Sequence, residues 1–168
     1  MVTCEEKVED LIGKILVVDD LEDNREVLAR RLMRQGCEVL LASSGLEALE
    51  CIKREEPEVV LLDIMMPGID GFEVIKRVRS DQERRQPLII AVSARHEAKA
   101  ITQALEMGAD DYVVKPYDFP VVWARIEKQL HRSRAAKLVR DVNTRLVDRL
   151  YKMRAAGKAA VDSQSQAK

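Results

Sequence analysis

The chain of 168 residues is long enough for one domain with a sizeable core and an additional segment. Hydrophobic residues make up 46% and charged residues 34%, which excludes a disordered chain, and the formal net charge of −1 excludes a general attraction to nucleic acid or to an anionic membrane. The longest apolar runs have the length of a strand, and the acidic residues 1–11 contain no apolar segment, so the sequence predicts neither a membrane span nor a secretory signal.

Short apolar runs alternate with amphipathic stretches along most of the chain. The predicted elements, in chain order, are strand 14–18, helix 21–35, strand 38–42, helix 44–55, strand 59–62, helix 72–80, strand 88–92, helix 97–107, strand 112–114 and a last helix from about residue 118. Gly36 and Gly108 follow two of the helices as stop signals, and Ser44 with Glu47 has the spacing of a capping box.

Five strand and helix units in a row favour a doubly wound, parallel sheet with helices on both sides. The strands are apolar at successive positions, as expected when both faces of the sheet are covered. In such sheets ligands bind beyond the carboxyl ends of the strands. The residues that follow each strand are therefore the first candidates for a functional site.

The segment after residue 130 has a helical pattern without proline as far as residue 156, where Gly157 is expected to end it. A seven-residue spacing places its seam residues at Ala136, Asn143 and Leu150 and at Val139, Leu146 and Met153. This segment either lies on its own domain, pairs with a second chain or transmits motion to a further domain. We divide the chain into a leader at residues 1–12, a main domain at 13–131, a helical extension or coiled coil at 132–156 and a disordered tail at 157–168.

Five polar side chains follow the carboxyl ends of four predicted strands. They are Asp19 and Asp20 after the first strand, Asp63 after the third, Ser93 after the fourth and Lys115 after the fifth. Carboxylates about 4 Å apart repel one another by roughly 4 kcal/mol at an effective dielectric constant near 20, so they require a cation. A set of oxygen ligands suits Mg²⁺, which would offset charge during phosphoryl transfer to a carboxylate. Asp63, in the middle of this group, is the predicted nucleophile.

Four runs carry a resemblance to the receiver domain of bacterial two-component response regulators. They are ILVVDD at residues 15–20, VLLDIMMPGIDG at 60–71, VSA at 92–94 and GADDYVVKP at 108–116. The resemblance implies a flavodoxin-like (CheY-like) fold of three α/β/α layers around five parallel strands. It also implies a histidine kinase or a histidine phosphotransfer protein as the phosphoryl donor.

The resemblance implies a role for each matching residue. Asp63 is the phosphoacceptor, Asp19, Asp20, Asp63 and the backbone carbonyl of Met65 hold Mg²⁺, and Lys115, joined to Pro116 by a cis peptide, pairs with the phosphoryl group. Ser93 and Tyr112 form a switch pair: Ser93 moves toward the phosphoryl group, and Tyr112 rotates from solvent into the vacated space. This movement repacks the face formed by the fourth helix, fifth strand and fifth helix, and a homodimer is expected through that face or through the C-terminal helix.

Two other readings stay open. An aspartyl-phosphate phosphatase or phosphotransferase of the haloacid dehalogenase type requires a DxDx[TV] motif, which the residues from Asp19 to Glu22 do not have. A receiver-like adaptor that needs no phosphorylation is disfavoured by Asp63 and Lys115. We therefore expect a non-enzymatic receiver, either a single-domain regulator or the front of a longer protein. The odd number of cysteines favours the cytoplasm, and the basic cluster at 131–134 has too few aromatic neighbours to indicate nucleic-acid binding.

Overall fold

The computed structural model describes residues 12–81 and 86–165, with side chains described as far as Met153. The chain divides into two compact units, Met1–Leu130 and His131–Lys168. Residues 1–11 of the leader predicted at 1–12 lie outside the described residues. Among the helices of the described residues, none combines the length and the hydropathy that a membrane span requires.

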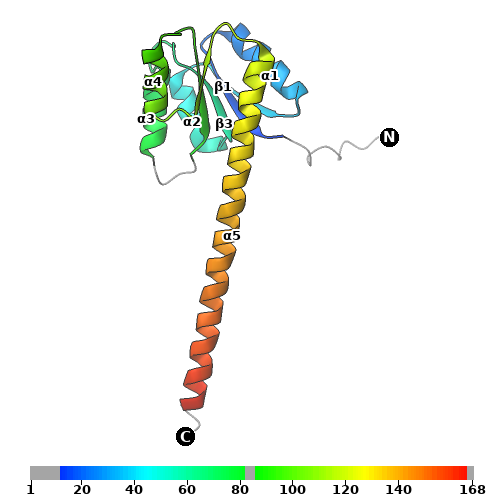
Figure 1. Ribbon diagram of the computed structural model, residues 1–168, viewed down its shortest axis with the longest axis vertical. Coiled ribbons are helices and arrows are strands. Elements are labelled where there is room, and N and C mark those ends of the chain that lie inside the picture. The colour runs from blue at the N-terminus through cyan, green and yellow to red at the C-terminus, as the bar shows by residue number, and fades with distance from the viewer. Residues whose placement is uncertain (1–11, 82–85, 166–168) are drawn as a thin grey trace, which may run out of the picture. The chain divides into compact units, whose positions relative to one another are not determined.

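All the predicted strands and helices are present, most of them within one or two residues of their predicted bounds (Figure 1). The elements are β1 Lys14–Val18, α1 Glu22–Arg34, β2 Glu38–Ala42, α2 Gly45–Glu55, β3 Val59–Asp63, α3 Gly71–Ser80, β4 Leu88–Ser93, α4 Ala98–Glu106, β5 Asp111–Val114 and α5 Phe119–Ser165. The strands form one parallel sheet in the order β2-β1-β3-β4-β5. This order confirms the flavodoxin-like fold that the sequence predicts.

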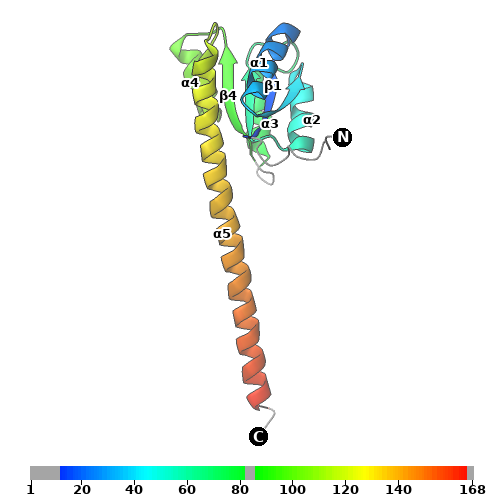
Figure 2. The same cartoon turned by 90° about the vertical axis from the view of Figure 1, so that its right-hand side faces the viewer.

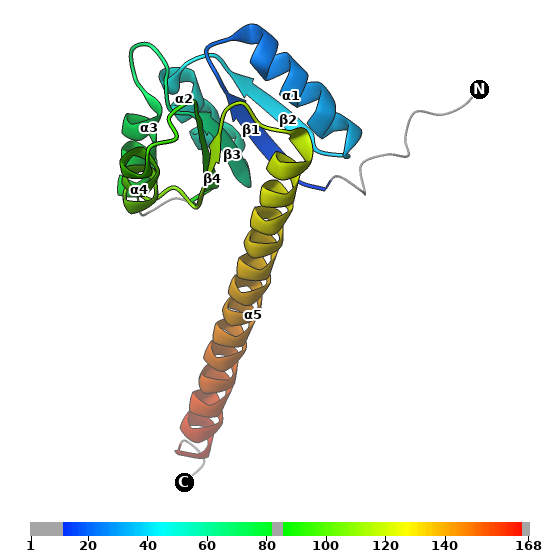
Figure 3. The same ribbon diagram turned by 45° about the horizontal axis from the view of Figure 1, so that its top comes forward.

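The sheet separates two hydrophobic cores, and successive strand residues point into alternate ones. In β1, Leu16 and Val18 pack with the buried residues of α2, α3 and α4, whereas Ile15 and Val17 pack with α1 and the first part of α5. Figure 3 shows α1 alongside β2 and β1 on one side of the sheet, with α3 and α4 on the other. Covering both faces explains why the interior positions of the strands are apolar in succession.

The ends of the helices follow local capping chemistry. The Ser44 side chain accepts a hydrogen bond from the Glu47 backbone N–H, as predicted, and Asp70 caps α3 in the same way. The Glu47 carboxylate, however, accepts from the N–H and hydroxyl of Ser43 and not from Ser44, so the predicted reciprocal box is displaced by one residue. These caps fix where α2 and α3 begin after the loops that leave the sheet.

Helix α5 continues past Gly157 to Ser165, and its ribbon can be followed from yellow to red in Figure 2. The predicted stop at Gly157 is therefore wrong, and residues 157–165 are helical where the sequence predicted a disordered tail. The reason is local: Ala155, Ala156, Ala159 and Ala160 surround the glycine, and alanine is the strongest helix former, whereas one glycine costs only about 1 kcal/mol. Residues 166–168 lie outside the described part of the chain.

Candidate functional site

Three carboxylates meet at the carboxyl edge of the sheet. Asp19 and Asp20 follow β1, Asp63 ends the neighbouring strand β3, and each offers an oxygen atom within 4.8 Å of the others. Asp19 is 3% exposed and Asp63 5% exposed, while Asp20 is more accessible. The parallel pairing of β1 with β3 is what brings residues 19 and 63 together.

Lys115 lies between two of these carboxylates. Its Nζ atom is 2.7 Å from Asp19 Oδ2 and 2.6 Å from Asp63 Oδ2. Burial alone would lower the pKa of this ammonium, but the hydrogen bonds and charges of the two carboxylates outweigh burial and raise it. The peptide between Lys115 and Pro116 is cis, as the resemblance implies, and the Lys115 N–H donates to the Ser93 carbonyl.

Asp19 has further partners that the sequence did not single out. Its carboxylate accepts from the Leu21 N–H at 2.9 Å and from Asn24 Nδ2 at 3.1 Å, and Arg25 donates to its backbone carbonyl. Burial acts to raise the pKa of Asp19, but the hydrogen bonds from Lys115, Leu21 and Asn24 prevail and hold this pKa below its usual value. Asp19 is therefore kept as an anion. Asn24 and Arg25 lie in the first turns of α1, and their contacts depend on the turn after Asp19, which the sequence pattern does not specify.

Asp63 has the opposite pKa shift. Burial raises its pKa, the negative charge of Asp19 adds to this effect, and the hydrogen bonds from Lys115 and from the Met65 N–H only partly oppose it. The Met65 N–H donates to Asp63 Oδ1 at 2.9 Å. The structure thus places Met65 next to Asp63, while the role of its carbonyl as a metal ligand stays a prediction.

The donor set fits a hard divalent cation. The three carboxylates bring more negative charge than the ammonium of Lys115 neutralises, and oxygen is the ligand atom that Mg²⁺ prefers. Neither cysteine nor histidine belongs to the cluster of Asp19, Asp20 and Asp63, so a zinc site of the usual kind does not fit these residues.

The predicted switch pair meets the backbone of one residue, Arg95. The Ser93 side chain is fully buried and its hydroxyl accepts from the Arg95 N–H at 3.2 Å, while the Tyr112 hydroxyl donates to the Arg95 carbonyl at 2.8 Å. Tyr112 is 7% exposed, so it has the inward position that the sequence associated with the phosphorylated state. These contacts of Arg95 were not predicted, because its backbone, which carries no side-chain signal, makes both of them.

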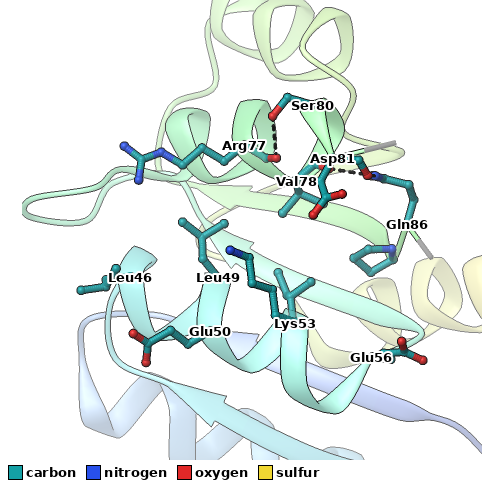
Figure 4. Close-up of a pocket in the computed structure, with 12 residues that line it drawn as sticks. Leu46, Leu49, Glu50, Lys53, Glu56, Arg77, Val78, Ser80, Asp81 and Gln86 are labelled. Carbon is teal, nitrogen blue, oxygen red and sulfur yellow. Dashed lines mark hydrogen bonds between the residues drawn. The ribbon is translucent and has the colours of Figure 1, made fainter. Parts of the chain in front are cut away.

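Two surface pockets adjoin this arrangement, and a further pocket lies apart from it. One of about 500 Å³ adjoins the site and is lined by α1 and by Lys115, Pro116 and Tyr117. A second, of about 590 Å³, lies between α4, β5 and α5 and includes Tyr112. A third, of about 440 Å³, lies between α2 and α3 and is lined by residues such as Leu49, Lys53 and Arg77 (Figure 4). This third pocket shares no residue with the acidic cluster.

Comparison with known proteins agrees with the geometry. The family model described as the response regulator receiver domain matches residues 15–127. The chain is 42% identical to a probable transcriptional regulator ycf27 of Guillardia theta, over 78% of this chain and 50% of that protein. It is also 42% identical to the alkaline phosphatase synthesis transcriptional regulatory protein PhoP of Bacillus subtilis, over 73% of this chain and 50% of that protein. The chain thus spans about half the length of the curated relatives it matches.

Solved structures give the same result. The Francisella response regulator 1452 receiver domain has a TM-score of 0.68 and 28% identity, covering 72% of this chain and 98% of that one. The BeF3-activated N-terminal receiver domain of RstA from Klebsiella pneumoniae has a TM-score of 0.66 and 33% identity. The match covers 70% of this chain and 98% of that one. With the fold, the acidic cluster and the family match in agreement, the chain belongs to the receiver domains of two-component response regulators.

Proposed function

We propose that Asp63 accepts a phosphoryl group from the phosphohistidine of a histidine kinase or a histidine phosphotransfer protein. One oxygen of the Asp63 carboxylate attacks phosphorus while the bond from phosphorus to the imidazole nitrogen breaks, and the electron pair of that bond stays on the imidazole. The observation that carries this proposal is the contact of Asp63 Oδ2 with the Lys115 ammonium at 2.6 Å, inside a buried acidic cluster. Lys115 is thus close enough to pair with a phosphoryl oxygen as negative charge gathers there.

Asp19, Asp20, Asp63 and the carbonyl of Met65 are the residues that would hold Mg²⁺. When bound, this ion supplies positive charge that offsets the charge of the transferred phosphoryl group. Asp19 is suited to a ligand role because its hydrogen bonds to Leu21 and Asn24 fix its carboxylate as an anion. Asn24 and Arg25 therefore act as positioning residues for the cluster.

The phosphoryl donor is proposed to dock over the pocket of about 500 Å³ next to Lys115. Apolar side chains of α1 and α5, such as Val27 and Phe119, line this pocket next to Lys115. Val27 is 43% exposed. The guanidinium of Arg31 lies 5.6 Å from the centre of the Phe119 ring, which gives the rim a positive charge. The rim also carries the anion Asp23, and an apolar floor with charges of both signs at its edge suits a helical partner that carries a phosphorylated histidine.

The output is proposed to pass through Ser93, the Arg95 backbone and Tyr112 to the face of α4, β5 and α5. Both side chains contact Arg95, so a Ser93 hydroxyl that turns toward a phosphoryl group gives up its bond to the Arg95 N–H and shifts the loop that Tyr112 holds. On that face Arg125 pairs with Asp111. A homodimer through this face, or through the exposed part of α5, is the proposed consequence, and the buried free thiols of Cys37 and Cys51 suit the cytoplasm.

The proposal is tested by incubating the protein with acetyl phosphate and Mg²⁺ and measuring its intact mass. We expect the parent chain to gain one phosphoryl group, the Asp63→Asn variant to gain none, and chelation of Mg²⁺ with EDTA to abolish the gain. Arg54→Ala, which removes an exposed ion pair with Glu55 at the C-terminal end of α2, is the matched control and should be labelled like the parent. Labelling of Asp63→Asn at the parental rate would refute the assignment.

A further inference from the structure

Asn24 belongs both to the acidic cluster and to the pocket of about 500 Å³ that adjoins it. Its side-chain nitrogen donates to the two carboxylate oxygens of Asp19, at 3.1 Å each. The same residue, which is half-buried in the first turns of α1, lines the pocket together with Lys115. The Asn24 amide therefore lies where a phosphoryl donor approaches the cluster.

The two polar atoms of this amide have opposite chemistry. A carboxylate only accepts hydrogen bonds, so the NH2 group of Asn24 is the end that binds Asp19, and the position of the amide oxygen is thereby fixed. Among the described residues, none donates a hydrogen bond to Asn24 Oδ1. The amide thus offers a carbonyl acceptor to a molecule in the pocket.

Two cations and one hydroxyl also line this pocket. Lys115 bonds to the acidic cluster, and the Arg31 guanidinium lies 5.6 Å from the centre of the Phe119 ring. Both cations suit phosphoryl oxygens, which every phosphoryl donor has. The Tyr117 hydroxyl can donate as well as accept. These groups therefore do not discriminate between one leaving group and another.

Asp23 is the other acceptor of the pocket. It precedes Asn24 on α1, it is exposed, and no described residue donates a hydrogen bond to its carboxylate. An exposed carboxylate is surrounded by water and counter-ions, so it affects the approach of every anionic phosphoryl donor alike. Asn24, in contrast, is held in place by Asp19. Its oxygen is thus the acceptor that the fold fixes beside the cluster.

Phosphoryl donors fall into two classes according to the group that leaves. In phosphohistidine and in phosphoramidate, phosphorus is bonded to nitrogen, and the leaving imidazole or ammonia carries an N–H group. In acetyl phosphate, phosphorus is bonded to an oxygen of acetate, and the oxygens of acetate only accept hydrogen bonds. A fixed carbonyl oxygen beside the leaving group stabilises an N–H group by a hydrogen bond, whereas it repels a carboxylate.

We infer that Asn24 Oδ1 accepts a hydrogen bond from the leaving nitrogen group, which makes Asn24 a specificity-determining residue for donors with a phosphorus–nitrogen bond. This inference rests on the proposed phosphorylation of Asp63. With phosphoramidate, an Asp63 oxygen bonds to phosphorus, the phosphorus–nitrogen bond breaks with its electron pair on nitrogen, and ammonia leaves with an N–H group on Asn24 Oδ1. The nitrogen of the phosphoramidate zwitterion is already fully protonated, so no further proton transfer is required.

Labelling by phosphoramidate and by acetyl phosphate, each with Mg²⁺ and followed by intact mass, tests the inference through the ratio of the two rates. Asn24→Leu removes the amide at nearly unchanged size, and we expect the ratio of phosphoramidate to acetyl phosphate labelling to fall about three- to ten-fold, as for the loss of one hydrogen bond. Asn24→Gln, which restores the amide on a longer stem, should recover part of this ratio. Arg30→Ala, which removes an exposed ion pair with Glu26 on the same helix, is the matched control and should leave the ratio unchanged.

Each other outcome identifies what fails. An equal fall of both rates in Asn24→Leu would mean that Asn24 acts only by positioning Asp19, which overturns the inference and leaves phosphorylation of Asp63 intact. A ratio that falls in Asp23→Asn but not in Asn24→Leu would assign the recognition to Asp23 and also overturns it. A parent chain that neither compound labels refutes the proposed phosphorylation, and the inference with it. Circular dichroism verifies that each variant is folded.

Discussion

The two parts of α5 on either side of residue 130 contain similar apolar side chains in opposite surroundings. Val122, Ile126 and Leu130 are at most 2% exposed, because they pack against the sheet, whereas Leu146 and Met153 are 52% and 65% exposed. Helical periodicity is the same in both parts. Periodicity therefore identifies the apolar face of the helix. Only the packing against the sheet shows that the first part of this face is buried within the chain.

The largest expected effect on stability comes from a leucine-to-alanine substitution, made separately in each part of α5. Leu130→Ala should lower the free energy of unfolding by about 2–5 kcal/mol, because it leaves a cavity beside the start of β1. Leu146→Ala, at a protein concentration where the chain is monomeric, should change it by less than about 0.5 kcal/mol. Urea denaturation measures both. Equal losses in the two variants would mean that the contrast in burial is wrong.

Arg79 in the receiver domain and Arg145 on the exposed part of α5 allow a similar comparison, with a smaller expected effect on the free energy of unfolding. Arg79 is largely buried and donates to the carbonyls of Gly108 and Pro87 and to the carboxylate of Asp110. Arg79→Ala should therefore lower the free energy of unfolding by about 1.5–3 kcal/mol. Arg145→Ala, on the exposed helix, should remain within about 0.5 kcal/mol of the parent. Thermal unfolding followed by circular dichroism distinguishes the two, and a neutral Arg79→Ala would contradict the role of this contact cluster.

Substitution of two glycines by alanine should change the stability of the protein in opposite directions. A Cβ atom at Gly71 would lie 2.5 Å from the Asp63 carbonyl and 2.6 Å from Ile64 Cα, so Gly71→Ala should destabilise the protein by about 1–3 kcal/mol and slow its labelling by acetyl phosphate. Gly157→Ala, in the helix interior, should stabilise the helix by up to about 1 kcal/mol. Unfolding and helicity are measured by circular dichroism. Normal labelling of Gly71→Ala would show that the loop after β3 tolerates displacement.

The smallest expected effect concerns charge. Residues 131–153 contain seven Arg or Lys side chains and two Asp side chains, so two paired helices repel one another at low ionic strength. Self-association measured by sedimentation should become a few-fold stronger when salt is raised. The Leu146→Glu variant should remain monomeric at every salt concentration. Weaker association of the parent chain in high salt would indicate that charge attraction, and not contact between exposed apolar side chains such as Leu146, holds the chains together.

Much of the receiver fold could be predicted because its signals are local. The bounds of β1 and β2 agree with the apolar runs, and the acidic residues after β1 and β3 meet because parallel strands bring their carboxyl ends to one edge. The contacts of Asn24 and Arg95 could not be predicted, because that of Asn24 depends on the turn after Asp19 and those of Arg95 are made by backbone atoms. The helix beyond Gly157 was missed because a stop signal was given more weight than the alanines around it.

The contact of Lys115 with Asp19 joins residues 96 positions apart in the chain. In the strand order β2-β1-β3-β4-β5, it connects the end of the edge strand β5 with the end of β1, across β3 and β4. The ammonium is therefore a non-covalent cross-link over three of the four strand-to-strand spacings of the sheet. Any group on Asp63 that draws the ammonium away from Asp19 breaks this long link and leaves only the existing contact between β5 and the central strand β3, so that β1 is no longer tied to the edge strand.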